Sequence, residues 1–182
     1  MDTPAPLSTY RIQLTPSFNF YHASRMCGYL KELGISHLYL SPCLAAVKGS
    51  RHGYDIVDPS RVNSELGGQE GFDALCRALR ESGLGLVLDI VPNHMAIGAR
   101  ANRWWWDVLA NGRSSRYAGH FDIRWDSPVT SLRNKLLVPI LRDEFERCLK
   151  AREIHLRRRG EDIHVVYFDR ELPVSAESLI EL

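Results

Sequence analysis

The chain has 182 residues, 45% of them hydrophobic and 25% charged, which is enough for a globular protein with its own core. Its 23 lysines and arginines balance 22 aspartates and glutamates, which argues against a nucleic-acid-binding or membrane-surface protein. The four cysteines form no Cys-x-x-Cys pair, so we expect no metal, and we expect no cofactor either. The N-terminus does not resemble a signal peptide, and no stretch reaches the roughly 20 apolar residues of a membrane span. We therefore expect a cytoplasmic protein.

The beginning of the chain has the pattern strand, helix, strand. Residues 8–14 alternate between apolar and polar types and are rich in β-forming residues, which predicts a strand. Apolar residues then recur at helical spacing over 26–33, and Gly34 marks the end of that helix. Residues 35–41 form a second apolar, β-prone run that ends at Pro42.

A long loop separates these elements from a second helix and a third strand. Residues 43–68 are rich in the residues of loops, and a helical pattern follows over 72–79. The stretch 84–94, LGLVLDIVPNH, begins as an apolar run typical of a strand buried on both faces. Since helices connect the three strands, we expect an α/β fold with parallel strands, in an open sheet or a (β/α)8 barrel. A dinucleotide fold is disfavoured because no glycine-rich turn follows the first strand.

The second half of the chain lacks this alternation. Residues 102–110 predict a short helix that carries three successive tryptophans, and residues 144–151 predict an amphipathic segment. The β-prone runs within 154–168 flank the basic cluster Arg157–Arg159, so we expect a hairpin with this cluster in its solvated turn rather than a polyanion site.

Two motifs resemble the α-amylase superfamily, glycoside hydrolase family 13, whose catalytic domain is a (β/α)8 TIM barrel. DIVPNH at 89–94 is similar to its first conserved motif, and HGYD at 52–55 is similar to its loop after the second strand. Longer runs resemble the maltooligosyltrehalose synthase family within it: STYRIQL, HLYLSP, HGYDIVDPSRVNSELGG, GLGLVLDIVPNHM, WWWDVLANGRSSRYAGHFDI and YFDRELP. The pair Asp58-Pro59, where amylases usually have Asp-Tyr, also favours this family.

The resemblance implies an isomerase that turns the reducing-end α-1,4 linkage of a maltooligosaccharide into an α,α-1,1 linkage by intramolecular transfer. The family's catalytic carboxylates follow the fourth, fifth and seventh strands, so none is expected in this chain, which alone should be inactive. A barrel of this kind needs about 250 residues. We therefore expect residues 1–98 to supply its first three βα units, residues 99–182 to begin an inserted subdomain, and the remainder of the polypeptide to complete the enzyme. A noncatalytic α-glucan-binding module, or part of another superfamily hydrolase, stays as an alternative.

The resemblance also assigns roles in binding the sugar. His94 would donate a hydrogen bond to a sugar hydroxyl, although a core histidine is the alternative. Tyr54 would stack on the sugar face, unless it only packs its loop. His52 and Asp55 beside it are further candidates, against which stands the ordinary capping role of a turn aspartate.

Asp89, although buried at a strand end, would organise hydrogen bonds, including one to an arginine, rather than act as nucleophile. Asn93 binds calcium in many amylases, but no acidic cluster accompanies it here, so we assign it to the same organising role and expect no metal. Helical neighbours lie about 100° apart, so at least one of the tryptophans 104–106 should reach a rim or cleft. We name Trp105 as the glucan-contacting candidate, with cover by part of a barrel cap or by another domain as the alternative.

Overall fold

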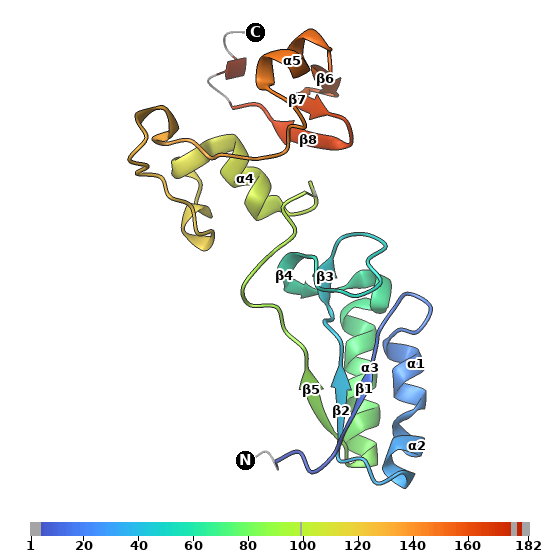
Figure 1. Ribbon diagram of the computed structural model, residues 1–182. Coiled ribbons are helices and arrows are strands. Elements are labelled where there is room, and N and C mark those ends of the chain that lie inside the picture. Colours follow the sequence, from blue (N-terminus) through green and yellow to red (C-terminus); the bar gives the residue numbers. More distant parts are fainter. Residues whose placement is uncertain (1–4, 99, 176–177, 180–182) are drawn as a thin grey trace. The chain divides into compact units, whose positions relative to one another are not determined.

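A computed structural model describes residues 5–98, 100–175 and 178–179 and divides the chain into two compact units, residues 1–96 and 97–182. The first unit contains a parallel sheet of β1 (Thr9–Ile12), β2 (His37–Leu40) and β5 (Gly85–Leu88), in the order β1-β2-β5 (Figure 1). The prediction of an α/β fold with three parallel strands is therefore confirmed.

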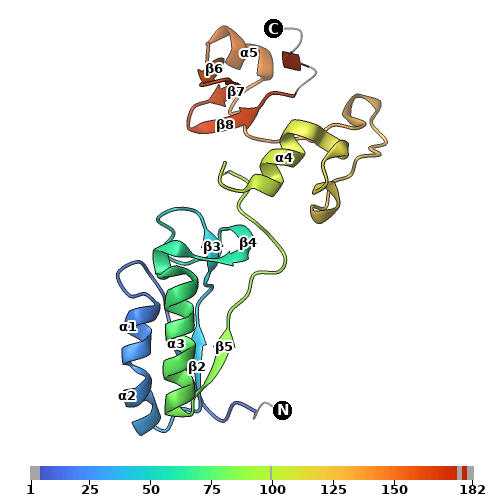
Figure 2. The same cartoon turned by 180° about the vertical axis from the view of Figure 1, so that it is seen from behind.

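Three helices cover one face of this sheet, as the reverse view in Figure 2 also shows: α1 (Phe20–Arg25), α2 (Cys27–Glu32) and α3 (Gly68–Ser82). The helix predicted over 26–33 therefore begins earlier and is interrupted at Met26. It begins at Phe20 because the Asn19 side chain accepts hydrogen bonds from the backbone N–H groups of Tyr21 and His22.

The loop predicted at 43–68 contains regular structure. It holds an antiparallel pair, β3 (Leu44–Ala46) and β4 (Ile56–Val62), and the 3-10 helix Ser64–Leu66. The prediction missed the strands because the pairing is short and its register shifts twice, so no regular alternation marks it.

The core of the first unit lies between the sheet and the helices. Alternate strand residues point to opposite faces, and Ile12, Leu38 and Leu40 point toward the helices, where they pack with Phe20 and Leu75. The other face of the sheet carries the polar residues of the first strand. β5 is not buried on both faces as predicted: it is an edge strand, and Leu88 at its end is 39% exposed.

The second unit begins with α4 (Arg103–Asn111), which confirms the predicted helix over 102–110. Asn102 caps it, since its side chain accepts a hydrogen bond from the Trp105 N–H. Single turns of 3-10 helix follow at Gly112–Ser114, Ala118–His120 and Thr130–Leu132, and α5 spans Phe145–Lys150.

The second unit ends in an antiparallel sheet of β6 (Ile154–Arg159), β7 (Asp162–Tyr167) and β8 (Arg170–Pro173). The hairpin is confirmed, but the basic cluster Arg157–Arg159 lies in β6 and not in the turn. The turn falls at Gly160, whose φ of +62° favours glycine. Arg157 and Arg159 point to one side, where both approach Glu171 of β8 at 3.6 and 3.1 Å.

None of the helices in the described ranges is long and apolar enough to cross a membrane. The four cysteines are free thiols in this structure, and burial raises the pKa of Cys27, Cys43 and Cys76.

Candidate functional site

Asp89 lies directly after β5, at the carboxyl edge of the parallel sheet. Its N–H donates to the Leu40 carbonyl, which continues the pairing of β5 with β2 by one residue and fixes the direction of the side chain. The carboxylate accepts a hydrogen bond from the Tyr54 hydroxyl at 2.7 Å, and its Oδ2 lies 3.6 Å from Nη2 of Arg11. A residue from the loop and a residue from β1 thus meet at the end of β5.

Arg11 closes this contact into a triangle. Its Nη2 lies 3.4 Å from the Tyr54 hydroxyl oxygen, and its guanidinium carbon lies 5.5 Å from the centre of the Tyr39 ring on β2. The hydrogen bond to Asp89 raises the pKa of the Tyr54 phenol, and the nearby Arg11 opposes this with a smaller effect. Tyr54 is therefore a neutral hydrogen-bond donor at neutral pH.

The loop that carries Tyr54 is a tight turn. Gly53 has a φ of +79°, and a Cβ there would lie 2.6 Å from the Pro42 carbonyl oxygen, so only glycine fits. The Gly53 N–H donates to Ser50 Oγ, and the Tyr54 N–H donates to His52 Nδ1. This geometry leaves the Tyr54 residue 38% exposed.

His52 and Asp55 flank Tyr54 on either side. The His52 ring stacks on the Tyr54 ring with centroids 6.0 Å apart, and its Nδ1 lies 3.8 Å from the Asp55 carboxylate. Asp55 also accepts a hydrogen bond from Ser50 Oγ. These contacts of Asp55 lie within its own loop, which supports the turn-capping alternative as well as the binding one.

Asn93 and His94 are exposed and lie in a segment without helix or strand. His94 Nδ1 and Asn93 Oδ1 are 3.1 Å apart. His94 is not part of the core that this chain forms, and its role in binding a sugar stays a prediction. Among the described residues, no hydrogen bond joins His94 to Tyr54 or Asp89, so the structure brings the latter pair together without His94.

The three tryptophans belong to the second unit. Trp104 stacks on Tyr117 at 5.2 Å, whereas Trp106 contacts His164. Trp105 is 8% exposed and packs on Phe121, so its present surroundings are protein. Its contact with a glucan stays a prediction.

The residues that the sequence analysis missed are Arg11 in β1 and Gln13 directly after it. Arg11 and Gln13 follow the alternation of STYRIQL and lie on the face opposite the core residues Ile12 and Leu14. A polar residue at each outward position was a visible signal. The run STYRIQL, which resembles the family, contains both residues but gave neither of them a role, and only the register of β1 on β2 brings Arg11 beside Tyr39.

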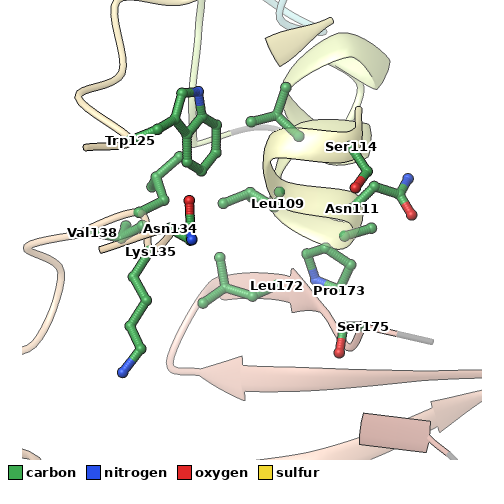
Figure 3. A pocket seen from close by; sticks show the side chains of 14 residues that line it. Leu109, Asn111, Ser114, Trp125, Asn134, Lys135, Val138, Leu172, Pro173 and Ser175 are labelled. Carbon is green, nitrogen blue, oxygen red and sulfur yellow. The ribbon is translucent and has the colours of Figure 1, made fainter. Parts of the chain in front are cut away.

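The second unit contains a separate hollow of about 620 Å³ (Figure 3). The Trp125 indole, Leu109, Leu172 and the Asn134 amide surround it. It includes none of the predicted site residues. In the described part of the chain, no three His, Cys, Asp or Glu side chains gather as a metal site would require.

Comparison with known proteins extends these observations. Residues 24–146 match the family model of the α-amylase catalytic domain. A putative maltooligosyl trehalose synthase of Mycobacterium tuberculosis (strain ATCC 25618 / H37Rv) is 52% identical over 126 residues, which cover 66% of this chain and 16% of the relative. An intracellular maltogenic amylase of Bacillus subtilis (strain 168) is 39% identical over 102 residues, which cover 56% of this chain and 16% of the amylase.

Solved structures agree with these relatives. The maltooligosyltrehalose synthase from Arthrobacter ramosus matches with a TM-score of 0.80 and 44% identity, over 94% of this chain and 21% of that one. Another maltooligosyl trehalose synthase matches with a TM-score of 0.83 and 38% identity, over 93% and 22% of the two chains. The chain thus spans 16–22% of the length of these relatives. It belongs to the α-amylase catalytic-domain family, and within that family it is maltooligosyltrehalose synthase-like.

Proposed function

We propose that this chain forms part of the sugar-binding wall of an enzyme that converts the reducing-end α-1,4 linkage of maltooligosaccharides into an α,α-1,1 linkage. In this proposal residues 1–98 are the first three βα units of a (β/α)8 barrel, and residues 99–182 begin an inserted subdomain. Support comes from the parallel order β1-β2-β5, the helices on one face, and the polar groups at the carboxyl edge.

The hydrogen bond between Tyr54 and Asp89 is the observation that carries the proposal. It ties the phenol to the end of β5 while the ring stays partly exposed, so the ring can offer an apolar face to a pyranose. His52 stacks on one face of this ring, so the opposite face would meet the pyranose. Asp89 acts here as an organiser, because its carboxylate already binds Tyr54 and faces Arg11.

His94 and its neighbour Asn93 would complete the sugar contacts. Their exposure leaves both side chains accessible, and the short distance between His94 Nδ1 and Asn93 Oδ1 leaves His94 Nε2 to meet a hydroxyl. Asp55 and Trp105 remain candidates for contacts farther along the glucan.

The reaction itself needs two carboxyl groups about 5–5.5 Å apart, one as nucleophile and one as acid and base. We assign neither to residues 1–182 and place both on segments outside them. The released glucose must attack the glycosyl-enzyme in place of water, so exclusion of water decides between transfer and hydrolysis. An aromatic platform that seals one side of the sugar contributes to that exclusion.

A chimera tests this function. The 126-residue matching segment of the Mycobacterium tuberculosis relative is replaced by that of this chain, and the product is incubated with maltohexaose. We expect reducing ends to disappear as the α,α-1,1 linkage forms. In the same chimera, Tyr54→Ala should lower kcat/KM about tenfold or more, since stacking of a nucleic-acid base on an aromatic side chain contributes about 1–3 kcal/mol and we expect a similar contribution for a pyranose.

The isolated 182-residue chain provides the control and should show no turnover. A folded chimera that only increases reducing ends would identify a hydrolase and contradict the proposal. Binding of maltohexaose by the isolated chain with no loss on Tyr54→Ala would instead support a glucan-binding module with another binding surface.

A further inference from the structure

Strand β1 and the residue that follows it direct two polar side chains toward the loop that carries Tyr54. Arg11 and Gln13 lie on the same side of the strand, away from the core residues Ile12 and Leu14. Arg11 Nη1 donates a hydrogen bond to Gln13 Oε1 at 3.2 Å, so the two side chains form a linked pair.

Gln13 reaches the backbone of the turn. Its Nε2 lies 3.3 Å from the carbonyl oxygen of Arg51 and 3.5 Å from that of His52. These two residues immediately precede Gly53 and Tyr54. Because the side chains of Arg51 and His52 are exposed, little apolar burial holds this part of the loop, and polar contacts must define its position.

Arg11 reaches the side chain at the tip of the same turn. Its Nη2 faces the Tyr54 hydroxyl oxygen at 3.4 Å and the Asp89 carboxylate at 3.6 Å. A continuous series of contacts therefore runs from Asp89 through Tyr54 and Arg11 to Gln13 and the turn carbonyls. One planar guanidinium makes both the contact to Gln13 and the contact to Tyr54, which an ammonium group could not do with the same geometry.

We propose that Arg11 and Gln13 are positioning residues that hold the 51–54 turn and the Tyr54 ring in the orientation needed to stack on a pyranose. The sugar in this statement rests on the proposed function, whereas the positioning itself is a property of the free chain. Measurements without sugar therefore test it independently.

Gln13→Glu is the first test, because it keeps the acceptor for Arg11 and replaces the Nε2 donor by an oxygen that repels the two carbonyls. NMR measures the hydrogen-exchange rates of the Gly53 and Tyr54 amides in the 182-residue chain, and both amides donate hydrogen bonds within the turn. We expect their exchange to accelerate about tenfold, the effect of one hydrogen bond, with no change in the β2 amides. Gln69→Glu is the matched control, since Gln69 bonds Asp73 on α3 and does not touch the loop.

Arg11→Met is the second test, because it keeps the length of the side chain and removes its charge. Arg11 opposes the rise that Asp89 causes in the pKa of Tyr54, so this variant should raise that pKa further. NMR titration of labelled tyrosines, assigned with Tyr54→Phe, measures the shift. Arg25→Met, at an exposed position of α1, should leave the titration unchanged.

The outcomes separate the two proposals. Unchanged exchange at Gly53 and Tyr54 in Gln13→Glu, or faster exchange throughout β2 as well, would reject the positioning role of Gln13. An unmoved Tyr54 titration in Arg11→Met would reject that of Arg11. If both variants behave as expected but Tyr54→Ala in the chimera leaves kcat/KM unchanged, the turn is positioned as proposed and the sugar-binding function is wrong.

Discussion

Residues 1–96 and residues 97–182 combine fold and surface chemistry in different ways. In the first unit, the aliphatic core lies on one face of a parallel sheet, and Arg11, Tyr39 and Asp89 belong to the other face. In the second unit, the same aromatic side chain takes part in packing and in polar contacts. Trp106 packs against His164 and also lies under the guanidinium of Arg100.

The backbone shows the same contrast. Among the described residues, the non-glycine positions with positive φ all lie in the second unit, at Asn134, Arg152 and Phe168. Such positions cost free energy unless the surrounding structure enforces them. In the first unit, we therefore expect substitutions on the polar face of the sheet to leave the core packing unchanged. In the second unit, we expect a substitution to change both the stability of the fold and the polar contacts at its surface.

The largest expected effect is in the core of the first unit. Leu38→Ala removes a side chain that is fully buried between the sheet and the helices, and it should lower the free energy of unfolding by about 2–5 kcal/mol. Hydrogen exchange of the α3 and β2 amides measures this loss. Leu7→Ala, at a position that is 92% exposed, is the control. If the separation of faces holds, the folded Leu38→Ala chain keeps an elevated Tyr54 pKa; a normal Tyr54 pKa would show that core and site are not separate.

Gly53→Ala should damage the site while sparing the core. The new Cβ would meet the Pro42 carbonyl oxygen at 2.6 Å, and the φ of +79° adds strain, so we expect a loss of about 1–3 kcal/mol in unfolding experiments with urea. Gly49→Ala is a matched control, because Gly49 has the same φ but no atom within 4 Å of the added Cβ. Equal losses in the two variants would mean that backbone strain alone, and not the contact with Pro42, requires glycine.

Each unit has a helix with an asparagine N-cap, so the same Asn→Ala substitution can be compared in both. Asn102→Ala removes the buried cap of α4 and should cost about 1–2 kcal/mol, whereas Asn19→Ala removes a more accessible cap of α1 and should cost about 0.5–1 kcal/mol. All four tryptophans lie in the second unit, so their fluorescence during urea unfolding reports Asn102→Ala directly. Far-UV circular dichroism reports both variants. A larger loss for Asn19→Ala would contradict the expectation that the buried cap contributes more than the accessible one.

A small effect that depends on pH is expected in β4 of the first unit. Burial alone would raise the pKa of Asp58, but hydrogen bonds from Ser60 and Arg61 outweigh it and lower the pKa below its ordinary value of 3.8. A lowered pKa in the folded chain adds stability above the ordinary pKa, and this stability disappears as the pH falls through the folded pKa. Ser60→Ala removes the Oγ donor, so the pKa of Asp58 should rise, with a loss of about 0.5–1.5 kcal/mol at pH 7 that shrinks in acid.

Carbon-13 NMR titration and urea unfolding at pH 7 and in acid check this prediction. Ser64→Ala, an exposed position in the following 3-10 helix, is the control. A loss for Ser60→Ala that stays the same at both pH values would mean that the Asp58 carboxylate is not its cause.

The sequence was most informative where one periodic pattern extends over a whole element. Apolar runs at 35–41 and 84–94 predicted the parallel strands, and the spacing over 72–79 and 102–110 predicted α3 and α4. Predictions were wrong or incomplete where several patterns compete. The basic cluster was predicted in a turn but lies in β6, where Arg157 and Arg159 form ion pairs with Glu171 of β8. This contact between strands is not visible in any local sequence pattern.

For the candidate site, the motifs DIVPNH and HGYD predicted that Asp89 and Tyr54 matter, but not that they bond to each other. Gly53 illustrates the difference: glycine in a turn is evident from the sequence, whereas the Pro42 carbonyl that excludes a Cβ comes from a separate segment. Local signals identify residue types, and contacts between distant segments determine their geometry.

The sequence by itself determined the family, the α/β class and the carboxyl end of β5 as a place for polar chemistry, because alternation and motifs are properties of short segments. Only the tertiary structure decided which residues meet there. Parallel pairing of β1 with β2 brings Arg11 and Gln13 to the same edge as Asp89, and the fold of the loop brings Tyr54 between them. The contact between Arg11 and Asp89 joins a residue of one edge strand, β1, to the residue directly after the other edge strand, β5, so it exists only once all three strands have paired.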